Sequence, residues 1–215
     1  MEAAIFTPFM KDSKQGNALA IFVKNQRLGA VKTRLAAAIG DQKALEVYAQ
    51  LVHLTLGAAA HTAAAVHLFY HERLEPAPSN LIAQVHVQQG DSLGARMLHA
   101  FDLLLADYSK VILIGSDLPE IHSALIEVAF SRLDFCDVVL GPATDGGYYL
   151  LGLKHPQPQL FESMSYSHSE VFNQTLARAK TSHLEVSQLA VLRDLDTYDD
   201  LLHFGFLNDD SDDAR

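Results

Sequence analysis

The chain has 215 residues, of which 49% are apolar and 20% charged, and its formal net charge is −10 at pH 7. This length and composition are typical of one soluble globular domain with a substantial core. The acidic balance argues against a nucleic-acid surface, which needs a basic face, but a mononucleotide needs only a few local cations. The single cysteine, Cys136, excludes an intrachain disulfide.

Apolar stretches and the composition of the two ends of the chain lead to expectations about its location and its domain limits. No apolar stretch approaches the length of a membrane span, and no basic region or clear cleavage site marks a signal peptide. The cytoplasm is therefore the default location. We expect one domain over 1–207, with an N-terminal arm over 1–17, and a disordered acidic tail over 208–215. A homodimer is compatible with the apolar content, although no pattern requires one.

The first part of the chain predicts a strand, a loop, a helix and a second strand. An apolar run flanked by polar residues predicts a buried strand over Ala18–Val23. The loop 24–33 leads to a helix over about Asp41–Ala60, with Asp41 placed to cap it. A second strand is expected over Ala64–Tyr70.

The rest of the chain continues this alternation after a proline-rich connector. Leu93, Met97 and Phe101 recur at helical spacing. The expected strands are Val85–Gln88, Val111–Ile114, Val138–Leu140 and Tyr148–Leu153, and the expected helices are Leu93–Tyr108 and Ser123–Leu133. We therefore expect an α/β fold with a mostly parallel central sheet and helices on both faces.

Three charged residues lie at or just past predicted strand ends: Lys24, Asp117 and Asp145. In open α/β sheets, ligands bind outside the carboxyl ends of the strands. We therefore expect one site at this edge of the sheet, where carboxylates can hold a hard divalent cation.

The loop after the first strand is basic in an otherwise acidic chain. Lys24, Arg27, Lys32 and Arg34 stand around Gly29. Arginine grips phosphate bidentately and lysine acts as a point charge, so this loop is a candidate phosphate site. A solvated basic loop is the alternative. The common P-loop and dinucleotide motifs are both absent.

Acidic residues supply candidate metal ligands. Asp117 is one, although it could also cap a helix ahead of Pro119. Asp194 and Asp196 stand at alternate positions of an extended segment and so point the same way. With Asp117 they would form a magnesium or manganese site with retained waters. The alternative is that Asp196 or Thr197 caps the last helix.

Two glycine-bearing segments complete the candidate site. The run Asp145-Gly146-Gly147-Tyr148 fits a pocket wall that accepts a sugar or acyl group, and a tight turn between strands is the alternative. Gly94 and Arg96 stand in the first turn of a predicted helix, where glycine permits close approach and arginine could meet a phosphate. An ordinary helix start is the alternative.

Five segments, in order over nearly the whole chain, resemble a bacterial family of nucleotide-diphospho-sugar transferase-like proteins, often labelled family A glycosyltransferases. The segments are Gly29-x-Val31-Lys32-Thr33-Arg34-Leu35, Gln89-Gly90-x-x-Leu93-Gly94-x-Arg96-Met97, Gly115-Ser116-Asp117-x-Pro119, Gly141-Pro142-x-x-Asp145-Gly146-Gly147-Tyr148 and Asp194-x-Asp196-Thr197-x-x-Asp200-Leu201. The resemblance implies the nucleotide-diphospho-sugar transferase fold.

The same scaffold is similar to the molybdenum-cofactor and 2-phospholactate guanylyltransferases. In those relatives the first loop binds nucleotide, the acid matching Asp117 holds the metal, and the acids matching Asp194 and Asp196 complete that site. Two departures stand out: Asn25-Gln26 replaces a usual proline, which predicts a looser loop, and Tyr166-Ser167 replaces a usual Trp-Ser, which affects substrate contacts.

Together, the residues and the resemblance imply a transferase that uses Mg²⁺ or Mn²⁺, a nucleotide or nucleotide-sugar donor and a small-molecule acceptor. Glycosyl transfer and nucleotidyl transfer both stay open, as do a non-catalytic nucleotide-binding protein and a metal-dependent phosphohydrolase. The expected catalytic residues are Lys32, Arg34 and Asp117. The expected nucleotide contacts are Lys24, Gly29, Lys32, Thr33, Arg34, Gly94 and Arg96, the expected substrate contacts are Asp145, Gly146, Gly147 and Tyr148, and the expected metal ligands are Asp117, Asp194 and Asp196.

Overall fold

The structure is a computed structural model that describes residues 14–166 and 168–206. Within these residues the strands form a seven-stranded sheet with the order β3-β2-β1-β4-β6-β5-β7. The strands are β1 (Gln15–Val23), β2 (Ala65–Tyr70), β3 (Ala83–Val87), β4 (Tyr108–Ile114), β5 (Val138–Pro142), β6 (Tyr148–Leu153) and β7 (Val186–Gln188). The helices are α1 (Thr33–Ile39), α2 (Asp41–Ala60), α3 (Leu93–Leu105), α4 (Ser123–Arg132), α5 (Val171–Thr181) and α6 (Tyr198–Phe204), with a short 3₁₀ turn at Pro158–Leu160.

The sheet is mostly parallel, as predicted. Strand β6 is antiparallel to both β4 and β5, and the other pairs are parallel. The exception has a local cause: only residues 143–147 join β5 to β6, too few for the crossover that parallel strands need. The order therefore combines crossovers with one hairpin, and the prediction of an α/β fold is confirmed.

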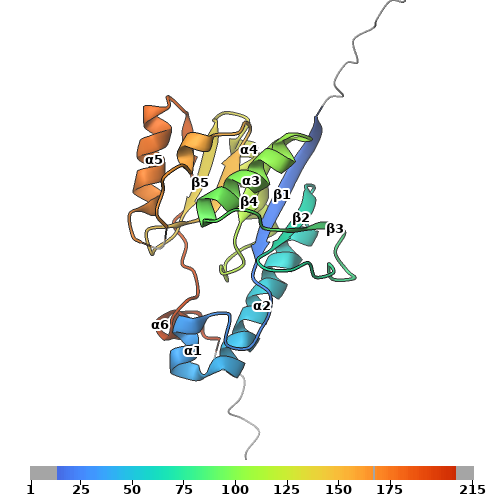
Figure 1. Cartoon of the computed structure of the whole chain (residues 1–215), viewed down its shortest axis with the longest axis vertical. Helices are drawn as coiled ribbons and strands as arrows, with labels where there is room; N and C mark the ends of the chain where they lie inside the picture. Colours follow the sequence, from blue (N-terminus) through green and yellow to red (C-terminus); the bar gives the residue numbers. More distant parts are fainter. Residues whose placement is uncertain (1–13, 167, 207–215) are drawn as a thin grey trace, which may run out of the picture.

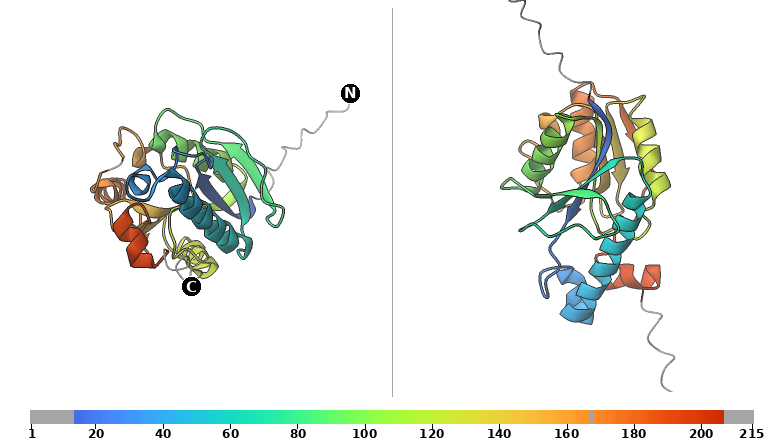
Figure 2. Two further views of the ribbon diagram at one scale, coloured as in Figure 1. Left: turned by 90° about the horizontal axis from the view of Figure 1, so that it is seen from below. Right: turned by 90° about the vertical axis from the view of Figure 1, so that its right-hand side faces the viewer.

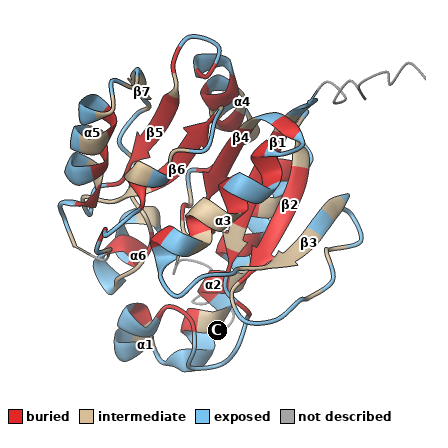
Figure 3. Ribbon diagram, turned by 45° about the horizontal axis from the view of Figure 1, so that its top comes forward, coloured by how far each residue is buried: buried red, intermediate tan, exposed pale blue. Residues whose placement is uncertain are grey.

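Helices cover both faces of the sheet, with α2 and α4 on one face and α3 and α5 on the other (Figure 2). The alternating side chains of β1 show how one strand contacts both layers of helices. Leu19, Ile21 and Val23 belong to the apolar cluster under α2 and α4, whereas Ala18 and Ala20 belong to the cluster under α3. The central strands are buried on both faces (Figure 3), which explains their continuous apolar runs.

A third, smaller apolar cluster lies beyond the sheet, where α1, the start of α2 and α6 meet (Figure 1). It contains Leu35 of α1, Leu51 of α2, Leu201 of α6 and Leu195, which precedes α6. This helix cluster ties the basic loop near the N-terminus to the acidic segment near the C-terminus, so both come to the same end of the sheet.

Several element boundaries differ from those predicted. Strand β1 begins at Gln15, whose N–H donates to the carbonyl of Asp107, so residues 15–17 of the predicted arm belong to the sheet. Residues 1–13 of that arm and the predicted tail 208–215 lie outside the described residues, and the domain limits stay a prediction. Asp41 is the first residue of α2 and not its cap, since Gly40, at φ 85°, holds that position.

Helices α1 and α5 and strand β7 were not predicted. Helix α1 has only seven residues, while α5 and β7 lie in polar sequence without a clear apolar period. No helix in the described part of the chain is long and apolar enough to cross a membrane.

Candidate functional site

A pocket of about 920 Å³ opens beyond the carboxyl ends of β1 and β4. Its lining comes from segments that are far apart in the sequence: the end of β1, the start of α3, the loop after β4, the β5–β6 turn, Tyr166, residues 168–171 and the segment before α6. The pocket lies where parallel α/β sheets bind ligands.

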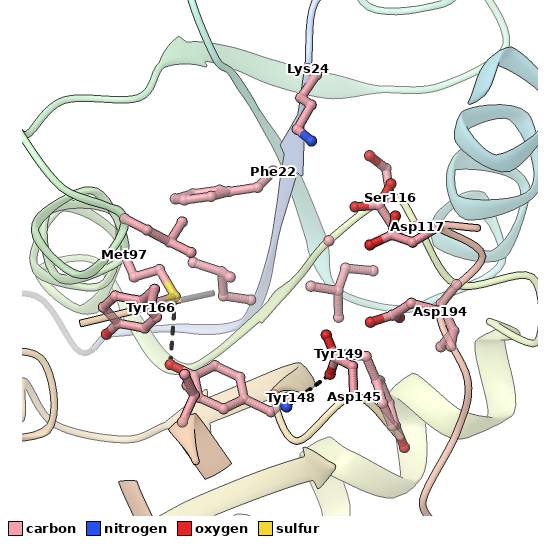
Figure 4. A pocket seen from close by; sticks show the side chains of 18 of the residues that line it. Phe22, Lys24, Met97, Ser116, Asp117, Asp145, Tyr148, Tyr149, Tyr166 and Asp194 are labelled. Atoms are coloured by element: carbon pink, nitrogen blue, oxygen red, sulfur yellow. Dashed lines mark hydrogen bonds between the residues drawn. The ribbon is translucent and has the colours of Figure 1, made fainter. Parts of the chain in front are cut away.

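Two unlike walls face each other across this pocket. Figure 4 shows Phe22, Met97, Tyr148 and Tyr166 on one side and Ser116, Asp117 and Asp194 on the other. The Tyr148 hydroxyl donates to the Met97 sulfur at 3.8 Å. An aromatic and sulfur-bearing wall therefore faces an acidic one.

A backbone contact and a buried leucine help to assemble the acidic wall. The N–H of Leu195 donates to the carbonyl of Asp117 at 3.0 Å, and the Leu195 side chain is fully buried in the helix cluster. Because side chains alternate along an extended segment, Asp194 and Asp196 both turn toward Asp117. The structure thus brings the three predicted metal ligands together.

Lys32 lies behind these carboxylates, and its side chain is 2% exposed. Its ammonium nitrogen is 2.5 Å from Asp117 Oδ1 and 2.8 Å from Asp196 Oδ1. Both contacts are ion pairs, and the Lys32 ammonium also donates a hydrogen bond to Asp196 Oδ1. Burial alone would lower the Lys32 pKa, but the two carboxylates outweigh it and raise the pKa. Lys32 is therefore a charged counter-ion inside the site.

The acids of the wall differ in their protonation. Burial, and then the negative charges of Asp117, Asp145 and Asp196, raise the pKa of Asp194 to about 7. For Asp196, burial acts in the same direction, but Lys32 and Arg34 outweigh it and lower the pKa. Asp194 is therefore partly protonated near neutral pH, whereas Asp196 is ionised.

The acids of the wall can supply part of a metal-ion shell, and they do not form a complete cage. Among the described residues, no group of three or more His, Cys, Asp or Glu side chains could hold a metal ion. Asp145 Oδ1 already accepts the N–H of Gly147 at 2.8 Å. Mg²⁺ is commonly held by one or two carboxylates, with substrate phosphates and waters completing the shell. Asp117, with Asp194 or Asp196, can supply such a pair.

Three cations line the pocket: Lys24, Arg34 and Arg96. Arg34 is largely exposed, and its guanidinium contacts Asp196 Oδ2 at 2.5 Å. Arg96 is held in place by His71 Nδ1 at 2.8 Å and by the carbonyl of Gly90 at 3.0 Å. Of the four cations in the basic loop, Lys24 and Arg34 reach the pocket, Lys32 backs it, and Arg27 pairs with Glu72 outside it.

Five of the predicted site residues do not line the pocket: Gly29, Lys32, Thr33, Gly94 and Gly146. Thr33 is the exposed first residue of α1. A Cβ on Gly94 would lie 2.9 Å from the ring of Tyr166, so this glycine serves packing between α3 and that ring. Gly146, at φ 88°, would bring a Cβ within 2.0 Å of the Ser169 carbonyl oxygen. The hairpin alternative for this turn is confirmed, while Asp145, Gly147 and Tyr148 still line the pocket.

Asn25 does not loosen the basic loop. It is 4% exposed, its side-chain amide donates to the Arg73 carbonyl and to Glu75, and its oxygen accepts the N–H groups of Glu72 and Arg73. The expectation of a looser loop was wrong, because these contacts fasten the end of β1 to the segment after β2.

Some pocket residues were missed by the sequence reasoning. His71 and Gln88 follow β2 and β3, and the strand-end rule that identified Lys24 and Asp117 could have found both. Ser116 was named only as part of the segment Gly115-Ser116-Asp117, with no contact predicted for it. Its hydroxyl lies 2.9 Å from that of Tyr48, which also accepts the Lys24 N–H at 2.8 Å. Tyr48 of α2 therefore links the two strand ends, and no pattern in the sequence signals that contact.

The alternative reading of the segment before α6 is confirmed for Thr197. Its side chain caps α6 in a reciprocal capping box with Asp200. Asp196 is not the cap, and its carboxylate instead meets Lys32 and Arg34.

The fold and the site define a nucleotide-diphospho-sugar transferase-like α/β protein. The chain belongs to the bacterial family DUF2064, described as an uncharacterized protein conserved in bacteria, whose model matches residues 54–168. The structure of a Desulfovibrio desulfuricans G20 protein that bears the provisional name nucleotide-diphospho-sugar transferase is 32% identical. The match covers 90% of this chain and 89% of that one, with a TM-score of 0.80. The resemblance found in the sequence is confirmed.

Two more distant structures share the fold. The inositol-1-phosphate CTP transferase from T. maritima is 13% identical, with a TM-score of 0.56 and coverage of 86% of this chain and 91% of that one. A manganese complex of a Mycobacterium tuberculosis H37Rv protein is 14% identical, with a TM-score of 0.51 and coverage of 89% and 97%. No curated protein matches the chain in sequence.

Proposed function

We propose that this protein is a nucleotidyltransferase that uses a nucleoside triphosphate with Mg²⁺ or Mn²⁺ and a small-molecule acceptor. The observation that carries the proposal is the pocket beyond β1 and β4, where Asp117, Asp194 and Asp196 stand with the cations Lys24, Arg34 and Arg96. A triphosphate needs both signs of charge: cations for its free oxygens, and carboxylates for the metal ion that accompanies it.

In the proposed reaction, a phosphate or phosphonate oxygen of the acceptor forms a bond to the α-phosphorus of the triphosphate. The bond between this phosphorus and the oxygen that bridges the α- and β-phosphates breaks. Pyrophosphate leaves with that electron pair. Lys24, Arg34 and Arg96 hold the triphosphate, and the positive charge of Arg34 stabilises the charge that develops. Asp117, with Asp194 or Asp196, would hold the metal ion, which supplies charge neutralisation and orientation of the phosphates.

The aromatic wall fits the uncharged part of a substrate. Phe22, Tyr148 and Tyr166 present rings across the pocket from the acids. Stacking on rings stabilises flat or apolar groups without requiring a charge. We infer that this wall holds either the nucleobase or the uncharged portion of the acceptor.

The comparisons support this proposal through the fold. The T. maritima structure is by name a CTP transferase, and the Mycobacterium tuberculosis structure holds manganese. Glycosyl transfer is the second candidate, favoured by the name of the Desulfovibrio desulfuricans protein. In that reaction the same acids and cations would hold the diphosphate leaving group of a nucleotide sugar.

A thermal-shift panel separates the candidates. Triphosphates and nucleotide sugars are tested with MgCl₂ and with EDTA, and a ligand at hundredfold excess over its dissociation constant adds about 2.7 kcal/mol of stability. We expect a magnesium-dependent shift with a triphosphate. A shift with a nucleotide sugar alone would support glycosyl transfer, and a metal-independent shift would support a non-catalytic nucleotide-binding protein. A separate assay of phosphate release tests the remaining alternative: release from a nucleotide without any acceptor would indicate a phosphohydrolase.

A further inference from the structure

The position between two of the proposed metal ligands is already filled by a side chain. The Lys32 ammonium lies 2.5 Å from Asp117 Oδ1 and 2.8 Å from Asp196 Oδ1. A divalent cation that contacts both of these carboxylates would need the place that the ammonium occupies. The two cations would also repel each other strongly at such a short separation.

The backbone around Lys32 is arranged to place this ammonium. Lys32 has φ 49° and ψ 43°, a left-handed conformation that is uncommon for a residue other than glycine. It immediately precedes α1, where the N–H of Ala36 donates to its carbonyl, and Leu35 of the same helix is buried in the helix cluster. Such conformations persist where the surrounding structure determines them, and they concentrate at functional sites.

Arg34 offers a natural comparison, because it also pairs with Asp196. Its side chain is 68% exposed, and it contacts Asp196 Oδ2, the oxygen that Lys32 does not contact. Arg34 therefore adds positive charge near the acids without filling the space between Asp117 and Asp196. Lys32 fills that space from a buried position.

We propose that Lys32 is a resident cation that a divalent metal ion must displace before it can contact Asp117 and Asp196. The free protein then holds such an ion weakly, and the ion enters together with the nucleotide, whose phosphates supply ligands and a partner for the displaced ammonium. This inference rests on the proposed metal site and adds an order of binding to it. Lys32 acts here as a positioning residue for the metal ion.

Manganese binding to the nucleotide-free protein tests the exchange. Free Mn²⁺ is followed by electron paramagnetic resonance during titration of wild type, Lys32→Met and Arg34→Met. Each variant loses one positive charge near Asp196. We expect Lys32→Met to bind Mn²⁺ at least about tenfold more tightly than wild type, and Arg34→Met to stay within about threefold of it. Equal affinity of wild type and Lys32→Met would overturn the inference, as would an equal gain in both variants.

Amine labelling of the wild-type protein tests the same exchange without a variant, and so does not depend on whether Lys32→Met folds. Acylation of amines, read by mass spectrometry, should leave Lys32 protected without metal. Excess MnCl₂ should raise the labelling of Lys32 relative to Lys110, which is paired with Asp134 away from the pocket. Unchanged labelling of Lys32 would overturn the exchange. The two proposals can fail separately. If Lys32→Met binds Mn²⁺ more tightly but no nucleotide stabilises the protein, the exchange is supported and the proposed function is rejected.

Discussion

At the scale of single residues, polar side chains hold the loops around the pocket. The side chain of Asn25 satisfies two N–H groups, one carbonyl and one carboxylate of the segment after β2. A buried backbone group left without a partner costs about 1–3 kcal/mol. The position of Lys24 therefore depends on its neighbour as much as on the strand that ends there.

Replacement of Asn25 tests this role. We predict that Asn25→Ala lowers the free energy of unfolding by about 2–3 kcal/mol, because it removes a buried side chain together with its four hydrogen bonds. The neighbouring exposed residue gives the control: Gln26→Ala should change stability by less than about 0.5 kcal/mol. Urea denaturation of both variants measures the difference, and equal stability of the two would contradict the role assigned to Asn25.

His67 gives the fold a defined pH dependence. Its side chain is 2% exposed, and its Nδ1 lies 3.0 Å from His86 Nε2. Burial, followed by the neighbouring His86, lowers the pKa of His67 to about 4 from the usual 6.5. As pH falls below about 6.5, the unfolded chain takes up a proton that the folded chain does not, so stability falls until about pH 4.

We predict that His67 accounts for about 1–2 kcal/mol of the stability lost between about pH 7.5 and pH 5. His67→Leu removes the titrating group and should show a correspondingly flatter dependence of the free energy of unfolding on pH. Chemical denaturation at several pH values measures it. Parallel curves for wild type and His67→Leu would show that the pKa of His67 does not change on folding, which would contradict the prediction.

At the scale of elements, the segment before α6 places the acids by packing. Leu195 and Leu201 are both fully buried in the helix cluster, but only Leu195 lies between Asp194 and Asp196. A cavity at either position weakens the cluster, whereas a cavity at Leu195 also frees the backbone that carries both acids.

The two leucines therefore make a matched pair. We predict that Leu195→Ala and Leu201→Ala each destabilise the protein by about 2–5 kcal/mol. Only Leu195→Ala should also weaken magnesium-dependent nucleotide binding, by about tenfold, when measured well below the unfolding temperature of both variants. If both variants bind nucleotide equally, packing at Leu195 does not position the acids.

Elements differ in how well the sequence predicts them. The apolar runs of β1 and β4 are long enough to identify as buried strands, and the hairpin after β5 was one of two interpretations of its glycine turn. Helix α1 has one buried residue, Leu35, and α5 has a polar composition, so neither gives an apolar period to detect. Their stability comes from tertiary contacts that a local pattern does not contain.

At the scale of the whole molecule, the sequence predicts which segments meet at the pocket but not how their side chains pack and pair there. The rule that ligands bind at the carboxyl ends of strands predicted one site for Lys24, Asp117 and Asp145. The alternation of side chains along an extended segment predicted that Asp194 and Asp196 point the same way. The burial of Lys32 between two acids depends on a left-handed residue and on a helix cluster formed by distant segments. The sequence also does not show that Gly94 lies against the ring of Tyr166, a residue from beyond β6.

The central claim is that metal ion and nucleotide bind together at the acidic wall. Calorimetric titration of the most stabilising triphosphate, in MgCl₂ and in EDTA, tests it most directly, with wild type, Asp117→Asn and the control Asp134→Asn. Asp134 pairs with Lys110 away from the pocket. We predict that removal of magnesium weakens binding at least about tenfold in wild type and Asp134→Asn, and changes little in Asp117→Asn. Equal affinity of wild type in MgCl₂ and EDTA, or an undiminished magnesium effect in Asp117→Asn, would contradict the claim.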